Sequence, residues 1–171
     1  VGAENAYHQI RNYIQDIPSI FYYNAICVIS DLSTNKAGTI TSGLDRFMEW
    51  KTKDGNYEDT AYASFETFYE GMFQKDRLLD ILKNFILFSG VSNSRFKVLA
   101  GYHQYFAVRK AIEKAKVATK TDGKGGVLWQ TQGSGKSLSR VYYPHLLHDA
   151  LDSPTIVVMT DRIDLDDQLY A

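Results

Sequence analysis

The sequence predicts an α/β protein in three successive parts, and three observations support this prediction. Residues 1–60 contain β-branched and aromatic runs after an opening helical stretch, and residues 61–94 space their apolar side chains at helical intervals. Residues 95–171 contain a strand, a glycine-rich turn, a helix and a second strand in that order. A strand–helix–strand unit of this kind implies a parallel sheet with a right-handed crossover.

The first part is expected to open with a helix and to continue as short strands. The helical pattern of residues 3–15 ends at Asp16-Ile17-Pro18, because proline disfavours helix in the residue before it. The apolar run of residues 21–30 predicts a largely buried strand. Two short strand-like pieces, residues 39–42 and 46–51, follow a polar turn.

The second part is expected to be a helical connector. Residues 61–88 carry two blocks of apolar residues at helical spacing, and packing of one apolar face is strongly favoured over any cofactor-binding role. Residues 89–94 predict a break between modules. The apolar positions are Phe65, Phe68, Tyr69, Met72, Phe73, Leu78, Leu79, Leu82, Phe85 and Ile86.

The third part carries the predicted βαβ unit. An amphipathic helix is expected over residues 102–117, and a short apolar strand over 126–130. A glycine-rich turn at 133–136 leads into a second helix over 137–151. Residues 154–160, which are rich in β-branched side chains, predict a second buried strand.

Composition bounds the class of protein. With 44% hydrophobic residues, the 171-residue chain can bury a core, and its net charge of -1 gives no support for bulk affinity for nucleic acid. The single cysteine, Cys27, lies in an apolar run, which favours a buried structural thiol over a nucleophile. Since no apolar run is long enough to span a membrane and no signal-peptide pattern opens the chain, we expect a cytoplasmic protein without a membrane partner. The chain opens inside a helical pattern without Met and stops as a helix begins, so we expect an excerpt of a longer protein.

The clearest chemical motif reads QGSGKS and occupies residues 132–137, directly after an apolar strand and before a helix. Gly133 and Gly135 permit a tight turn whose backbone N–H groups can approach phosphate, and the helix adds its positive N-terminal dipole. Lys136 would reach the β and γ phosphates of a nucleotide, and the Ser137 hydroxyl would complete the shell of a Mg²⁺ ion.

Two features of this region admit a second interpretation. The full phosphate-loop pattern is not met, because Gln130 stands in place of its first glycine, and a glycine–serine stretch can also be a flexible linker. The apolar strand and amphipathic helix on either side favour nucleotide binding. Asp161 follows the last strand as a Mg²⁺-binding Walker B carboxylate would. However, this is the first strand after the helix that follows the glycine-rich turn, and a Walker B strand would come later in the chain. A helix-capping role is favoured for Asp164.

Two segments of the third part resemble helicase motifs I and Ia of the R (HsdR) subunits of type I restriction–modification enzymes. They read GGVLWQTQGSGKSLS and SPTIVVMTDRIDLDDQL. Upstream, GYHQYFAVRKAI resembles the element that precedes motif I in this family, where Gln104 would read the adenine edge; otherwise it is an ordinary helix-surface residue. The nucleotide-binding residues that the resemblance implies are Gln104, Thr131, Gln132, Gly133, Ser134, Gly135, Lys136 and Ser137, with Lys136 and Ser137 in catalytic roles.

The N-terminal part resembles the same family independently. The segment AYHQIRNYIQDIPSIFYYNAICVISD is similar to the stretch that closes the family's PD-(D/E)xK nuclease domain. Gln9 and Tyr13, four residues apart on one helix face, fit the Q-xxx-Y element of such nucleases. The resemblance implies that they place DNA and support the active site. Without it, a polar pair on a helix would be the simpler interpretation.

The resemblance implies a specific architecture and function. Residues 1–60 would be the end of the nuclease domain, 61–94 the connector, and 95–171 the start of a RecA-like lobe. The parent would use ATP and Mg²⁺ to translocate double-stranded DNA and then cleave it, in a complex with methyltransferase (M) and specificity (S) subunits. The nuclease carboxylates, the Walker B box and the second RecA-like lobe would lie outside this sequence.

Four positions depart from the family pattern: Gln130, Arg140, Pro144 and Ile163. Pro144 removes one intrahelical hydrogen bond and is expected to kink or shorten its helix. Two other functions therefore remain open. One is a stand-alone nucleotide-binding module, and the other is an inactive structural remnant.

Overall fold

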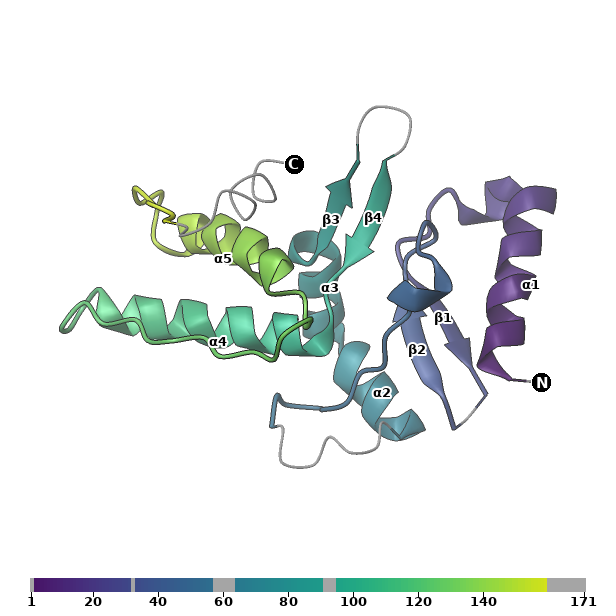
Figure 1. The fold of residues 1–171 in the computed structure, drawn as a ribbon, viewed down its shortest axis with the longest axis horizontal. Coiled ribbons are helices and arrows are strands. Elements are labelled where there is room, and N and C mark those ends of the chain that lie inside the picture. Colours follow the sequence, from purple (N-terminus) through teal and green to yellow (C-terminus); the bar gives the residue numbers. More distant parts are fainter. Residues whose placement is uncertain (1, 32, 57–63, 91–94, 160–171) are drawn as a thin grey trace. The chain divides into compact units, whose positions relative to one another are not determined.

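In the computed structural model the chain divides into two compact units, residues 1–102 and residues 103–171 (Figure 1). The described residues are 2–31, 33–56, 64–90 and 95–159. The division falls after the region in which the sequence predicts boundaries near residues 60 and 94, and those boundaries stay predictions.

The first unit opens with helix α1 (Ala3–Asp16), which is followed by the short 3-10 helix η1 (Pro18–Phe21). Pro18 is the first residue of η1. Strands β1 (Cys27–Ser30) and β2 (Asn35–Gly38) form an antiparallel hairpin, followed by the 3-10 helix η2 (Leu44–Arg46). The α1 helix ends as predicted, one residue before the Ile17-Pro18 pair.

A small apolar core joins α1 to this hairpin. One face of the helix packs on the buried side of the strands, and Phe47 closes the cluster. The ring of Phe47 lies so close to Gly38 that a Cβ there would approach it within 2.8 Å. Glycine is therefore required in β2 by close packing. The fully buried members of the cluster are Ala3, Cys27, Ile29 and Phe47.

Two helices and a second hairpin complete the first unit. Helix α2 (Phe65–Met72) begins at Ser64, whose side chain accepts a hydrogen bond from the Thr67 N–H. Helix α3 (Lys75–Asn84) begins at Gln74, whose side chain accepts one from the Arg77 N–H. Strands β3 (Ile86–Ser89) and β4 (Phe96–Leu99) pair in antiparallel register.

Side-chain hydrogen bonds tie β4 to the turn that follows β2. The Thr39 hydroxyl donates to the Lys97 carbonyl at 2.9 Å, and the Lys97 N–H donates to the Thr41 hydroxyl oxygen at 2.7 Å. Thr39 is buried, so this contact is shielded from water. Segments that the sequence assigns to different parts therefore pack in one unit.

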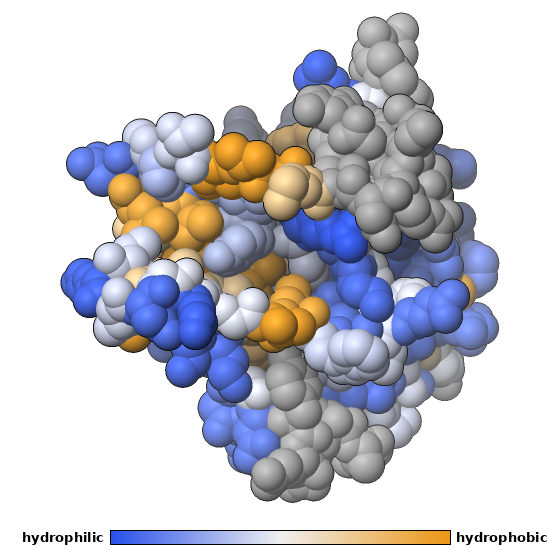
Figure 2. Space-filling model, turned by 60° about the vertical axis from the view of Figure 1, so that its left-hand side comes forward, coloured by the Kyte–Doolittle hydropathy of each residue, from blue (hydrophilic) through white to orange (hydrophobic). Residues whose placement is uncertain are grey.

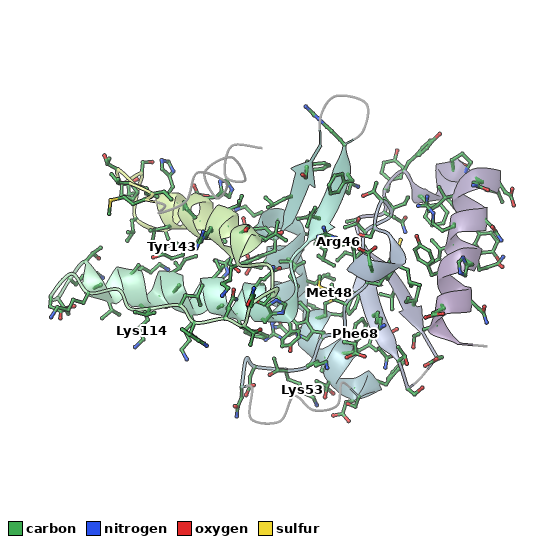
Figure 3. The ribbon with its side chains drawn as sticks, in the orientation of Figure 1. Arg46, Met48, Lys53, Phe68, Lys114 and Tyr143 are labelled. Atoms are coloured by element: carbon green, nitrogen blue, oxygen red, sulfur yellow. The ribbon has the colours of Figure 1, made fainter. Side chains whose placement is uncertain are left out.

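Trp50 packs closely against helix α2 at Gly71. A Cβ on Gly71 would lie 2.5 Å from Cδ1 of the Trp50 indole, which is almost fully buried together with Phe68. On the outer side, the Lys53 ammonium lies 2.6 Å from a carboxylate oxygen of Glu66 and 2.6 Å from one of Glu70, both on α2 (Figure 3). These exposed pairs add little to stability, whereas the apolar contact fixes the approach of the helix.

The described part of the second unit contains helices α4 (Tyr102–Ala118) and α5 (Lys136–Ala150), and the segment between them is irregular. Each helix buries one stripe, and the side chain of Lys114 points away from α5 (Figure 3). Both helices confirm the predicted ranges to within one residue. The buried stripes comprise Gln104, Tyr105, Val108, Ile112, Ala115 and Ala118 of α4, and Ser139, Tyr142 and Leu146 of α5.

Several predicted strands of the first unit are wrong in position. The predicted strand over residues 21–30 shrinks to β1, and β2 forms in the stretch predicted as a polar turn. There the wholly buried Asn35 accepts a hydrogen bond from the Ser30 hydroxyl at 2.6 Å, which makes a polar side chain compatible with a buried strand. Residues 39–42 form a turn closed by the Ser42 N–H on the Thr39 carbonyl, and residues 46–51 contribute one bridge, Met48 to Ala37.

The predicted connector is also more varied than expected. It contains two helices separated at Gln74, and its last residues form β3 instead of a helical turn. Ile86, Leu87 and Phe88 suit a strand once a partner is available, because apolar side chains alone do not separate helix from strand over so short a stretch. Their partner, β4, lies in the part predicted to begin a new module.

The predicted parallel strands are absent from the second unit as described. Residues 126–130 and 154–159 are irregular, and every strand pair among the described residues is antiparallel. Val127 and Trp129 are 94% and 88% exposed, so they are not the buried strand expected. A strand needs neighbouring strands to satisfy its backbone groups, and these segments have no strand partner in the described part of the chain. Figure 2 shows apolar areas among polar side chains on one face.

Candidate nucleotide-binding loop

The loop before α5 adopts the tight turn that its glycines predict. Gly133 and Gly135 have φ angles of 80° and 75°, in the left-handed region that favours glycine. The Ser134 hydroxyl donates to the Thr131 carbonyl at 2.8 Å, and the Ser134 N–H points to the same oxygen at 3.4 Å. The turn is thus closed by its own hydrogen bonds, with Gln132 exposed at its outer side.

This loop delivers the chain into α5 without a side-chain cap. Gly135 is the N-cap residue, and its carbonyl accepts from the Leu138 N–H at 3.0 Å. By contrast, α2 and α3 are each capped by their own N-cap side chain. The N-terminal end of α5 therefore keeps the positive electrostatic character that attracts an anion such as phosphate.

Lys136 lies at the start of α5 and is exposed. Its ammonium donates to the Gln130 carbonyl at 2.8 Å, across the mouth of the loop. Gln130 is itself half-buried and accepts from the Ser139 hydroxyl at 3.4 Å, while its Nε2 is buried with no hydrogen-bond partner among the described residues. An exposed ammonium on a neutral carbonyl can be transferred to a stronger acceptor at little cost.

Gln104 lies against the loop, as its predicted membership of the site requires. Its side chain is 3% exposed, and its Nε2 donates to the Gly135 carbonyl at 3.0 Å and approaches the Ser134 carbonyl at 3.4 Å. A Cβ on Gly135 would clash with this amide. The structure thus places Gln104 as a brace of the loop. Its expected role at the adenine edge stays a prediction.

His103 is a loop contact that the sequence analysis does not predict. Its Nε2 lies 2.8 Å from the Ser134 carbonyl oxygen. The available signal was its position beside Gln104 at the start of α4, the helix that carries the predicted site residue. A histidine alone in a helix carries no pattern that points to a loop 31 residues further along the chain.

The departures from the family pattern leave the loop itself intact. Arg140 is exposed on α5, where a charged side chain meets water. Of the two effects expected at Pro144, shortening is wrong, because α5 continues through it to Ala150, and a kink stays a prediction. Ile163 lies outside the described residues, as do Asp161 and Asp164.

Gln9 and Tyr13 lie on the solvent side of α1. Both side chains are exposed, with Tyr13 45% accessible, while the opposite face carries Ala6, Tyr7 and Ile10 against the core. They share a helix face, as their spacing predicts. Their expected role in DNA cleavage stays a prediction.

The thiol of Cys27, in the first unit, is buried away from solvent. Cys27 is a buried free thiol, and burial raises its pKa above the ordinary value, against a smaller opposing effect from Lys97. Such a thiol stays protonated at neutral pH, which agrees with the structural role predicted for it. Among the described residues, no three His, Cys, Asp or Glu side chains gather into a metal site. No described helix is both long and apolar enough to cross a membrane.

Comparison with known proteins adds to this geometry. A family model described as the SWI2/SNF2 ATPase matches residues 103–171, the whole second unit. The HindI endonuclease subunit of a type I restriction enzyme from Haemophilus influenzae is 37% identical over 96% of the chain. A Methanocaldococcus jannaschii protein, MjaIXP, provisionally named a type I restriction enzyme endonuclease subunit, is 31% identical over 98% of the chain.

The stretch that matches the ATPase model contains the glycine-rich loop and helix α5. Over nearly its whole length the chain is a homologue of type I restriction enzyme endonuclease (HsdR) subunits. It spans 16% of the length of the HindI subunit and 18% of that of MjaIXP.

Proposed function

We propose that residues 131–137 form the ATP-binding loop of a DNA-translocating and DNA-cleaving endonuclease subunit. The observation that carries this proposal is the geometry of the loop. It contains two glycines in the left-handed region and leads into a helix without a side-chain cap, whose first residue is an exposed lysine. This combination concentrates N–H donors and positive charge, which suits a triphosphate. The match of the same region to ATPases supports the choice of ATP.

Four residues of the loop have proposed tasks. Gly133 and Gly135 let the backbone approach the phosphates, and Lys136 leaves the Gln130 carbonyl to bind the β and γ phosphates. Ser137, in the first turn of α5, would hold Mg²⁺ together with the nucleotide. Bound Mg²⁺ would neutralise charge on the phosphates during hydrolysis.

The remaining parts of the proposal rest on homology. The endonuclease subunits that the chain matches support double-stranded DNA as substrate and the methyltransferase and specificity subunits as partners. The nuclease-domain tail at residues 1–60 and the RecA-like lobe that begins near residue 95 are proposed on the same grounds. ATP hydrolysis would drive translocation before cleavage, and Gln9 and Tyr13 would help to place the DNA strand to be cut.

The Lys136→Ala variant tests the ATP-binding proposal in the full-length protein. We expect DNA-stimulated ATP hydrolysis to fall by about 100-fold or more, because a charged group that stabilises the transferred phosphoryl is lost. Thermal unfolding should stay at the wild-type temperature, since Lys136 is exposed. Lys114→Ala, which removes an exposed lysine from the outer side of α4, should leave hydrolysis unchanged. Normal ATPase activity in Lys136→Ala would refute the proposal.

The Gln9→Ala variant tests the nuclease part separately. DNA cleavage should fall by about tenfold or more while ATP hydrolysis is retained, because a polar group that positions the DNA is removed and the proposed phosphate-binding residues are left unchanged. Gln15→Ala removes an exposed glutamine from the same helix and serves as the control. Cleavage at the wild-type rate by Gln9→Ala would count against the proposed nuclease tail.

A further inference from the structure

The Ser134 carbonyl is held by two neighbouring side chains of α4. His103 Nε2 lies 2.8 Å from this oxygen, and Gln104 Nε2 lies 3.4 Å from it and 3.0 Å from the Gly135 carbonyl. The shorter contact belongs to His103. Because a carbonyl oxygen can only accept, the histidine Nε2 must carry the proton, in either the neutral or the charged ring.

Anchoring a carbonyl also fixes the amide that shares its peptide plane. The Ser134 carbonyl and the Gly135 N–H belong to one planar trans unit, so they point in opposite directions. With the oxygen held toward α4, the Gly135 N–H is directed to the opposite side of the turn. The Gly135 carbonyl, held by Gln104 and by the first turn of α5, orients the Lys136 N–H in the same manner.

A glycine-rich loop does not secure this orientation by itself. Gly135 has a φ angle of 75° and glycine reaches both signs of φ, so the peptide unit before it can rotate at low cost. The rotated form would turn the negative Ser134 oxygen toward the space where an anion would bind. An external hydrogen bond to that oxygen is needed to favour one orientation over the other.

We propose that His103 is a positioning residue of the phosphate-binding loop. By holding the Ser134 carbonyl, it keeps the Gly135 N–H aimed at the phosphates of the bound nucleotide. The proposal rests on the proposed ATP-binding function and assigns His103 a task apart from base recognition. Its loss therefore weakens binding of every ligand that carries the phosphate chain, with or without adenine.

Three variants of the full-length protein test this role. His103→Phe keeps a ring and removes the donor, and His103→Gln keeps an N–H donor at similar reach. His145→Phe makes the same exchange at an exposed histidine of α5 and is the matched control. Displacement of a fluorescent ATP analogue measures the affinities for Mg·ATP and for Mg²⁺ with inorganic tripolyphosphate.

The expected result is a common shift for both ligands. His103→Phe should weaken Mg·ATP and tripolyphosphate alike, by about tenfold, as the loss of one partly buried hydrogen bond implies. His103→Gln should recover most of that loss, and His145→Phe should bind as wild type. A loss confined to ATP, or an equal loss in the phenylalanine and glutamine variants, would overturn the positioning role.

Lys136→Ala, measured in parallel, distinguishes a failure of the proposed ATP-binding loop from a failure of the proposed role of His103. If it abolishes binding while His103→Phe binds normally, the ATP-binding loop stands and the role of His103 is refuted. If neither variant changes binding, the phosphate-loop assignment itself has failed. Unfolding temperatures of all variants should match the wild type, and a His103→Phe protein that unfolds early would assign its defect to folding.

Discussion

At the scale of single residues, Gly135 is subject to two separate constraints. Its backbone has a φ angle of 75°, which costs an L-residue roughly 1–2 kcal/mol. Its missing side chain also leaves room for the Gln104 amide, which donates to the Gly135 carbonyl. A methyl group here would thus strain the turn and displace its brace together.

The Gly135→Ala variant should bind Mg·ATP about tenfold more weakly or worse, because both effects disturb the N–H groups that would meet the phosphates. Titration calorimetry on the full-length protein measures this. Gly125→Ala changes a glycine of the preceding segment that has no atom within 4 Å of the added Cβ, and it should bind normally. Equal affinities in the two variants would contradict the geometry described for the loop.

Those features of the loop that depend on residues adjacent in the sequence could be predicted. The turn at Gly133 and Gly135, and Lys136 at the start of a helix, follow from a short contiguous pattern. The contacts of His103 and Gln104 with the loop do not, because they depend on how a distant helix packs. Spacing along the chain carries no information about such a contact.

At the scale of elements, the start of α1 is held by a residue from the β1–β2 connection. Asp31 accepts a hydrogen bond from the Ala3 N–H at 3.2 Å, in the first turn of the helix. The same carboxylate accepts from the Thr34 N–H at 2.6 Å and from the Ser33 hydroxyl at 2.9 Å. These bonds, that from Thr34 first, lower the pKa of Asp31 below its ordinary value.

The Asp31→Asn variant should unfold at a lower temperature than wild type at pH 7. Because the folded-state pKa is lowered, the ionised carboxylate stabilises the fold above the unfolded pKa of about 3.9. That stabilisation disappears as the pH falls through the lower folded value, so the two unfolding temperatures should converge in acid. Scanning calorimetry from pH 7 to pH 3 measures the difference.

Asp16→Asn is the control for this pH dependence. It removes the same charge at the C-terminal end of α1, where the helix dipole disfavours an acid, so the unfolding temperature should not fall. A difference between Asp31→Asn and wild type that stays constant across the whole pH range would show that the carboxylate charge is not responsible.

Elements whose signal is local were predictable, and those that depend on a partner were not. The helices α1, α4 and α5 follow from apolar spacing and from Pro18. The strand β3 was predicted as helix, since its identity depends on pairing with β4 ten residues further along. Asn35 is polar yet fully buried, so composition does not indicate β2, whereas in the structure its side chain accepts a hydrogen bond from Ser30.

At the scale of the whole molecule, the two units differ in how complete their packing is. The first unit joins two antiparallel hairpins and three helices around buried aromatic side chains. The second leaves Val127, Trp129, Val157 and Met159 more than 75% exposed. Apolar, β-branched segments of this kind favour a sheet, and the parallel sheet that the sequence predicts requires further strands as neighbours.

The composition of residues 126–130 and 154–160 predicts strands of a parallel sheet, yet residues 126–130 and 154–159 are irregular in the structure. Formation of the sheet depends on pairing that no local pattern contains. The loop at residues 131–137 nonetheless has its turn formed, held by hydrogen bonds from within the second unit.

The most direct test of the central claim is hydrogen exchange at the backbone amides of residues 133–137 in the full-length protein, with and without Mg·ATP. We predict that nucleotide slows exchange at these amides by about tenfold or more, because phosphate oxygens would accept from them. The segment at residues 120–125 should be unaffected. Saturating ATP that leaves exchange at residues 133–137 unchanged would contradict the claim that this loop holds the triphosphate.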